Sequence, residues 1–210
     1  MTTVTAAMVK QLRDATGAGP LDCKKALEAH EGNLEAAQQF LREKGMARAD
    51  RKLGAGREMN EGVIASYQHF TKRLAVQVEV NCETDFVAKT EAFQQFAYDI
   101  ALQVANMNPQ FVQEEDIPGS VREAERTLQQ RILREDAKHA DKPPAIQDRI
   151  VEGRLEKWYE EVVLMRQRFI KDESQTIADL LKEAVSELGE SIRIRRFIRY
   201  EVGEDIEAAS

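Results

Sequence analysis

The strongest constraint on the fold is a change in the spacing of apolar residues along the chain. Val4, Met8 and Leu12 recur every four residues, as they do on one face of a helix. Residues 74–80 instead carry an apolar side chain at every second position, as a strand with one buried face does. Because the two patterns occupy separate blocks, the sequence predicts an α+β fold, in which helices pack on a small sheet.

The N-terminal block predicts a compact module of three short helices. A glycine-rich break follows the first helix, and Pro20 suits the first position of the second. Asn33 can cap the third helix, which we expect to end at Gly45. Residues 46–59, which contain Gly54-Ala55-Gly56, are rich in Ala, Arg, Lys and Gly and predict a linker.

This linker divides the expected domains. We expect an N-terminal three-helix domain at residues 1–52 and an α+β core at residues 53–210. Period-two alternation in the core predicts three strands of an antiparallel sheet, near residues 62–68, 73–81 and 191–202. In the last strand we expect one apolar face, Ile192, Ile194, Ile198, Tyr200 and Val202, and an opposite face, Arg193, Arg195, Phe197, Arg199 and Glu201.

Helical spacing returns between the second and third strands. A helix is expected from Thr90 to about Asn106, and Ser120-x-x-Glu123 is a capping-box signal for another. Pro143-Pro144 interrupts the pattern, which predicts a helical hairpin at about residues 119–166. The apolar stripe after the capping box is Val121, Ala124, Leu128 and Ile132. The inner side of the second arm is expected to be Ile146, Ile150, Leu155, Trp158 and Val162.

Composition excludes several classes of protein. With 30 Lys and Arg against 37 Asp and Glu, the formal net charge is -7, which lacks the basic footprint of a general nucleic-acid binder. No apolar run approaches the roughly 20 residues of a membrane span. Cys23 and Cys82 are far apart and form no Cys-x-x-Cys motif, which argues against a zinc ribbon. Two separate cysteines also suit a protein of the reducing cytoplasm.

Residues suited to catalysis are few. His30, His69 and His139 each lie more than five residues from any other His or Cys, so no metal-ligand spacing occurs. There is no Gly-x-Ser-x-Gly, phosphate-loop or Rossmann pattern, and Gly17-Ala18-Gly19 is better explained as a turn between helices. We therefore expect no catalytic residue, no metal and no cofactor, and no binding or hydrolysis of GTP by the protein alone.

One segment, residues 81–89, has two possible interpretations. In the first, it is an ordinary strand-to-helix turn, with Thr84 or Asp85 as the helix cap and Phe86 in the core. In the second, Asp85 and Phe86 lie at an exposed tip and present a carboxylate and an aromatic wedge to a partner. The pattern alone favours the first.

Three stretches, however, closely resemble the bacterial elongation factor Ts family. Residues 9–27 are similar to the N-terminal signature of the family, and residues 80–87 to its second signature. The segments at 151–154, 169–172 and 195–197 resemble its C-terminal half. The resemblance covers nearly the whole chain, and the first two signatures are long and specific.

The resemblance implies a translation factor that is not an enzyme. Family members are guanine-nucleotide exchange factors that bind elongation factor Tu with GDP and promote GDP release, so that GTP can bind. The resemblance implies that four residues disturb the magnesium site of that partner: Thr84, Asp85, Phe86 and Val87. It also implies that the N-terminal module, similar to ubiquitin-associated domains, contacts the partner through six residues: Leu12, Gly17, Ala18, Gly19, Pro20 and Leu21.

The resemblance is to the short-chain members, because the chain has one copy of the strand pair. Such members are expected to be cytoplasmic homodimers that contact neither nucleic acid nor membrane directly. Two residues depart from the family pattern. Pro20 stands where many relatives have an aliphatic residue or Met, and Arg168 stands where relatives usually have Pro. Two rival hypotheses remain, an adaptor that uses only residues 1–45 and an RNA-binding ribosome factor that uses the C-terminal arginines.

Overall fold

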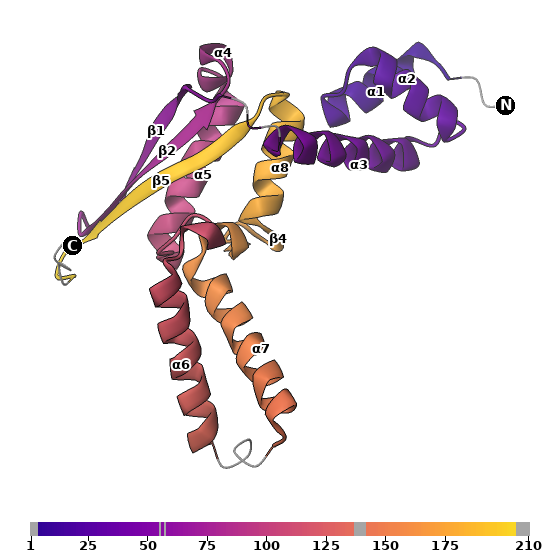
Figure 1. Ribbon diagram of the computed structural model, residues 1–210. Coiled ribbons are helices and arrows are strands. Elements are labelled where there is room, and N and C mark those ends of the chain that lie inside the picture. Colours follow the sequence, from indigo (N-terminus) through magenta and orange to yellow (C-terminus); the bar gives the residue numbers. More distant parts are fainter. Residues whose placement is uncertain (1–3, 55, 57, 137–141, 205–210) are drawn as a thin grey trace. The chain divides into compact units, whose positions relative to one another are not determined.

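The computed structural model describes residues 4–54, 56, 58–136 and 142–204 (Figure 1). The chain forms two compact units, each assembled from segments far apart in the sequence. The first unit comprises Met1–Val63, Val80–Phe96 and Asp179–Arg193. The second comprises Ile64–Glu79, Ala97–Ala178 and Ile194–Ser210. Helices and a small sheet occur together, which confirms the α+β class, whereas the domain division at residue 52 stays a prediction.

Three helices form the N-terminal part of the first unit: α1 (Ala6–Thr16), α2 (Pro20–Ala29) and α3 (Leu34–Leu53). Gly17 ends α1 with a φ of 66°, a left-handed conformation that glycine adopts at low cost. Pro20 is the first residue of α2, and the Asn33 side chain accepts a hydrogen bond from the backbone of Ala36 at 3.1 Å. Both predicted starts are confirmed. The buried residues of this small core are Leu12, Cys23, Ala26, Leu27, Ala37 and Leu41.

The predicted end of the third helix at Gly45 is wrong. Helix α3 continues to Leu53, so the first part of the expected linker is helical, and Ala55 lies outside the described residues. A Cβ added at Gly45 would lie 2.2 Å from the Oγ of Ser186, which belongs to α8 (Ile177–Leu188). This glycine therefore permits close approach between two helices and does not terminate one, a distinction that sequence spacing does not carry.

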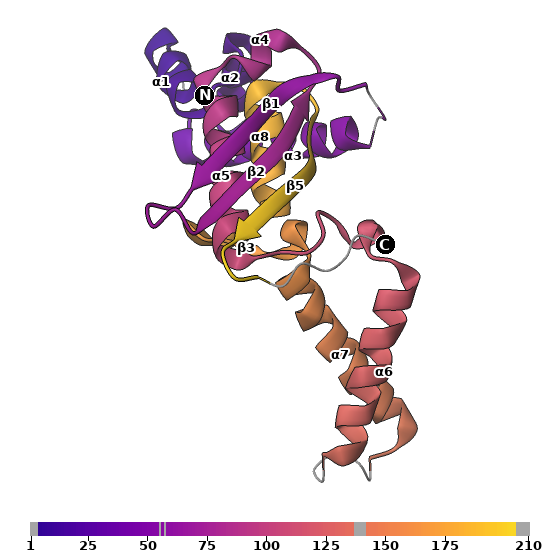
Figure 2. The same cartoon turned by 90° about the vertical axis from the view of Figure 1, so that its left-hand side faces the viewer.

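The sheet consists of β1 (Glu61–Gln68), β2 (Leu74–Cys82) and β5 (Ile192–Glu201), in the order β1-β2-β5. The three strands lie where the alternation predicted them, and they run antiparallel (Figure 2). Helix α5 (Glu91–Met107) passes along one face of the sheet. Side chains on that face of β2, Val76, Val78 and Val80, are buried. The opposite face carries no covering element among the described residues of the second unit.

The predicted faces of the last strand are wrong beyond Ile194. Arg195 and Arg196 are both exposed, which breaks the alternation and exchanges the two faces. From this point on, the Arg199 side chain is only 12% exposed, whereas Tyr200 is 65% exposed. Arg195 and Arg196 both donate to Glu79, at 2.8 and 2.7 Å. One carboxylate thus satisfies two consecutive cations on the open side of the sheet.

A helical hairpin is formed by α6 (Gly119–Glu135) and α7 (Pro144–Val162), as predicted (Figure 1). Pro118 occupies the N-cap of α6 without a capping side chain, so the predicted capping box at Ser120 is absent. The buried residues of this region are Ile117, Leu133, Val151, Leu155, Tyr159, Val162 and Val163. The apolar residues Val121, Leu128, Ile132 and Ile146 are exposed. Two paired helices bury only one narrow stripe each, so a predicted apolar stripe can face solvent.

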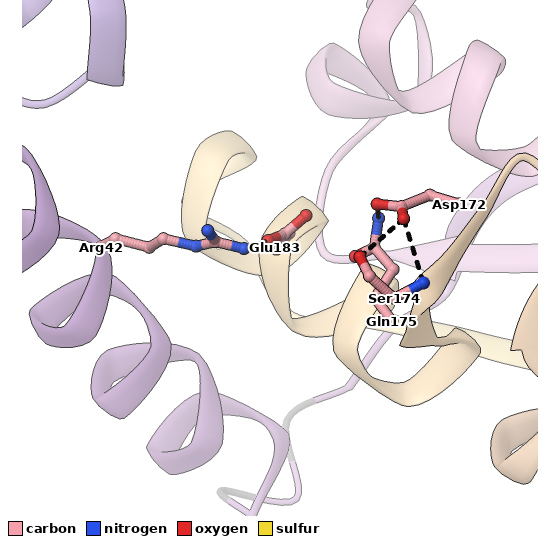
Figure 3. Close-up of polar contacts among 5 residues, drawn as sticks. All are labelled: Arg42, Asp172, Ser174, Gln175 and Glu183. Carbon is pink, nitrogen blue, oxygen red and sulfur yellow. Dashed lines mark hydrogen bonds and ion pairs between the residues drawn. The ribbon is translucent and has the colours of Figure 1, made fainter.

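Two short strands were missed, β3 (Arg168–Phe169) and β4 (Asp172–Thr176). Within β4, the Asp172 carboxylate accepts hydrogen bonds from the backbone and hydroxyl of Ser174 and from Gln175, at 3.1, 2.6 and 3.0 Å (Figure 3). Arg168, which departs from the usual Pro, belongs to β3, and the long helix α7 ends earlier, at Val162. The 3-10 helices η1 (Glu114–Asp116) and η2 (Leu164–Arg166) complete the elements of this unit.

Candidate functional site

The segment after β2 forms a one-turn helix, α4 (Asp85–Ala88), with an exposed aromatic ring. Thr84 is its N-cap, because the hydroxyl accepts a hydrogen bond from the backbone of Val87 at 3.4 Å. The side chain of Phe86 is 80% exposed. Of the two interpretations, the capping role of Thr84 in the first is confirmed and the burial of Phe86 is wrong. The exposed tip of the second is what the structure contains.

Neighbouring residues supply the apolar contacts that Phe86 does not make. Ala88, on the inner side of the same turn, is buried, and Val87 is half-buried. Phe93, the third residue of α5, is fully buried with an exposed fraction of 0%. The core is therefore complete without the Phe86 ring. The exposed ring on this turn makes Phe86 a candidate contact residue, because it contributes little to the core.

The carboxylate beside this ring is paired with a lysine. Lys89 donates a hydrogen bond to Asp85 at 2.5 Å, one helical turn along the chain. This hydrogen bond holds the pKa of Asp85 below its ordinary value, and it raises the pKa of Lys89. The lowered pKa keeps Asp85 charged at neutral pH, and with 46% of its side chain exposed the carboxylate is partly accessible to a partner.

The turn is held from beneath by the segment that follows α8. One oxygen of Glu190 accepts a hydrogen bond from the backbone N–H of Thr84 at 3.0 Å, and the other accepts from its hydroxyl at 2.6 Å. Glu83 accepts from the backbone of Ser191 at 2.7 Å. Sequence reasoning missed Glu190 as part of this site, and it gave no role to Glu83, which lies within residues 81–89. The two segments are 106 residues apart, so no local pattern could connect them.

Cys82 lies directly beneath the turn and is fully buried. Its thiol donates a hydrogen bond to the Thr84 carbonyl at 3.2 Å. Burial, with the nearby Glu190 carboxylate, raises the pKa of this thiol, so the thiolate is disfavoured. Cys82 therefore acts as a small core residue that braces the turn.

The second predicted contact region is the loop between α1 and α2. Leu21 is 66% exposed, and Gly17, Gly19 and Pro20 are also exposed. Leu12 in contrast is 1% exposed and belongs to the core of the three helices. Its side chain supports the loop and is not part of the surface, because helical spacing marks a buried face and an interaction face alike. Ala18 is half-buried, and its carbonyl accepts a hydrogen bond from the Cys23 thiol at 3.4 Å.

Charged residues of both signs line a cavity of about 740 Å³ next to this loop, between α3 and α8. Arg42 pairs with Glu183 (Figure 3). Lys44 and Arg48 lie 3.0 and 3.5 Å from Asp22, and the hydrogen bond from Lys44 lowers the pKa of that carboxyl. Arg42 thus pairs with a carboxylate of α8, and Lys44 and Arg48 pair with a carboxylate of α2.

Within the described ranges, no group of three or more His, Cys, Asp or Glu residues is placed to hold a metal ion, and His139 lies outside those ranges. The helices of the same ranges include none that is both long and apolar enough to cross a membrane.

A family model described as Elongation factor TS matches residues 5–204. The chain belongs to the elongation factor Ts family. The Elongation factor Ts of Carboxydothermus hydrogenoformans is 50% identical over 203 residues, covering 97% of this chain and 91% of that protein. That of Thermoanaerobacter sp. is 49% identical over 207 residues, covering 99% and 98%. That of Thermosipho melanesiensis is 47% identical over 201 residues, covering 96% and 100%.

The resemblance drawn from the two signatures is thereby confirmed, and the chain is a translation elongation factor of this family. These three relatives have nearly the length of this chain, as expected for its short-chain members.

Proposed function

We propose that the protein is a guanine-nucleotide exchange factor, which binds elongation factor Tu with GDP and promotes GDP release. The observation that carries this proposal is the exposed ring of Phe86 beside the charged Asp85, on a turn braced from below. The ring is aimed outward at no cost to the core. These two residues lie within the second signature of the family.

The chemistry of the partner explains how such a tip can act. A GTPase holds its nucleotide through a magnesium ion that bridges phosphate and protein oxygens. Magnesium requires near-ideal octahedral geometry, so displacement of one ligand is costly. An aromatic wedge inserted beside the ion would displace ligands, and a carboxylate could bind groups that normally brace them. We assign these roles to Phe86 and Asp85, with Thr84 and Val87 holding the turn.

This mode of action requires no chemical step. The factor binds the nucleotide-free partner more tightly than the loaded one, and reciprocity then requires that GDP weakens the binding of the factor. The protein accordingly works as a binding partner in the cytoplasm and not as an enzyme, and it touches neither nucleic acid nor membrane.

We assign docking to the loop of the N-terminal helices, through Gly17, Gly19, Pro20 and Leu21. Leu21→Ser is the appropriate test, because deletion of the first 52 residues would also strip α3 from Ser186 and Glu183 of α8. The variant should weaken complex formation and leave the exchange rate at saturation unchanged. A loss of exchange at saturation would assign this loop a direct role in nucleotide release.

We further propose a homodimer formed through the open face of the sheet. Four apolar side chains on the second unit are exposed there or at the strand end: Ile64, Ile198, Tyr200 and Val202. Exposed apolar residues gathered on one sheet face are typical of an interface. Sedimentation at micromolar concentration should give twice the chain mass of 23.8 kDa. A monomer that exchanges nucleotide at full rate would contradict the dimer.

The decisive experiment measures release of labelled GDP from elongation factor Tu with and without the protein. Acceleration by catalytic amounts of protein supports the exchange function. An unchanged release rate, together with RNA binding that falls steeply with salt, would favour the ribosome-factor hypothesis instead.

A further inference from the structure

We propose that Glu190 is a positioning residue for nucleotide exchange, which fixes the orientation of the α4 turn and therefore of Phe86. The inference deepens the proposed exchange function and rests on it. It assigns a role to a residue outside both signatures, on the segment that follows α8.

The hydrogen bonds to Glu190 determine how the Thr84 hydroxyl can act as a cap. The carboxylate accepts both from the backbone N–H of Thr84, at 3.0 Å, and from its hydroxyl, at 2.6 Å. Since a carboxylate can only accept, the hydroxyl proton must point toward Glu190. The hydroxyl oxygen then turns a lone pair toward the backbone N–H of Val87, 3.4 Å away. One glutamate thus orients the whole cap of α4.

A second carboxylate makes the reciprocal link. Glu83, which precedes Thr84, accepts a hydrogen bond from the backbone of Ser191, which follows Glu190. Each segment thus supplies one carboxylate to the backbone of the other. Ser191 is buried, and its hydroxyl lies 3.4 Å from the carbonyl of Lys52 at the end of α3. Lys52 in turn donates to the carbonyl of Gly189. The segment that carries Glu190 is therefore itself fixed to the end of a 20-residue helix.

This support matters because the turn cannot hold itself. Helix α4 has only four residues, and isolated helices of that length are unstable in water. The ring of Phe86 is 80% exposed and gains little from packing, so its direction depends on the backbone of the turn. A wedge that is already oriented avoids the entropic cost of ordering when it meets its partner. Loss of the two hydrogen bonds between Glu190 and Thr84 should therefore slow nucleotide exchange, even though no contact with the partner is lost.

The test uses the full chain and compares three variants. Glu190→Ala removes both acceptors, and Glu190→Gln retains one acceptor oxygen. Glu187→Gln is the matched control, because Glu187 is an exposed residue of the neighbouring helix α8. At saturating Glu190→Ala, GDP release from elongation factor Tu should be at least about tenfold slower than with the wild type, as expected for the loss of hydrogen bonds to a charged group. Glu190→Gln should be intermediate, and the control unchanged.

Amide hydrogen exchange in the free protein provides a readout that does not depend on the partner. The Thr84 and Val87 amides should exchange at least about tenfold faster in Glu190→Ala, whereas the amides of buried α5 should keep their protection. If Glu190→Ala fails to fold, Glu190→Gln with the same two measurements decides the question.

The outcomes separate the two proposals. Wild-type protein that leaves GDP release unchanged would overturn the exchange function, whatever the variants show. Wild-type acceleration that persists in the folded Glu190 variants would overturn the positioning role alone. Unchanged protection of the Thr84 and Val87 amides would also overturn it, because the turn would then be held by other contacts.

Discussion

Helix α4 and the helix that follows it, α5, use the same residue type in opposite ways. Phe86 and Phe93 are seven residues apart, yet the first is 80% exposed and the second is fully buried. Phe93 lies in a helix of 17 residues that packs along the sheet. Phe86 lies on a single turn whose inner side is already filled by Ala88. The length of the helix and the packing around it, and not the residue type, therefore decide whether a ring stabilises the fold or remains available to a partner.

The largest effect is expected for Phe93→Ala. Truncation of a fully buried ring leaves a cavity and should lower the free energy of unfolding by about 3–5 kcal/mol. Chemical denaturation measures this directly. The folded fraction should still accelerate GDP release at the wild-type rate, since Phe93 does not reach the surface. A Phe93→Ala protein as stable as the wild type would show that the Phe93 ring does not stabilise the core.

Phe86→Ala should give the opposite result. The exposed ring contributes little to the core, so the free energy of unfolding should change by less than about 0.5 kcal/mol. If Phe86 acts as the proposed wedge, GDP release from elongation factor Tu should slow by roughly 30-fold, equivalent to about 2 kcal/mol at an interaction hot spot. A variant that melts early and exchanges normally would make the turn purely structural.

A smaller effect is expected for Asp85→Ala. Loss of a hydrogen bond to a charged group costs about 1.5–3 kcal/mol, and we expect the lower end because Lys89 already competes for this carboxylate. Titration of nucleotide-free elongation factor Tu should show this as weaker binding. Thermal melting of the free variant provides the control, and it should stay close to that of the wild type.

The smallest effect concerns the charge pair itself. The pKa of Asp85 is lowered in the folded protein. The charge pair therefore stabilises the turn at any pH above 3.8, the ordinary pKa of this group, and this stabilisation is lost as the pH falls through the folded-state pKa. The raised pKa of Lys89 places the corresponding loss above pH 10.5. In Lys89→Gln, an NMR titration should move the pKa of Asp85 back toward 3.8. An unchanged titration would show that Lys89 is not the cause.

Much of the fold was predictable because it is encoded in residues that are close in sequence. The start of α2 at Pro20 and the cap at Asn33 depend on one turn of chain, and the three strands follow from alternation within each segment. The family signatures at 9–27 and 80–87 are likewise contiguous.

The features that were not predictable depend on residues far apart in the chain. By its sequence context Gly45 resembles a helix end. In the structure, a Cβ added at this position would lie 2.2 Å from the Ser186 Oγ, so the glycine permits close packing of two helices. Leu12 has the spacing of a helix face, and only packing shows that this face is turned inward.

Thr84 and Phe86 show the same division within the proposed site. Sequence alone determined that a cap and an aromatic residue follow the second strand, because capping is satisfied within three residues. Only the tertiary structure decided that the ring points to solvent and that Glu190 holds the turn, 106 residues later. Burial and long-range hydrogen bonds are set by whichever segments the folded chain brings together, and periodicity and capping signals carry no information about such distant partners.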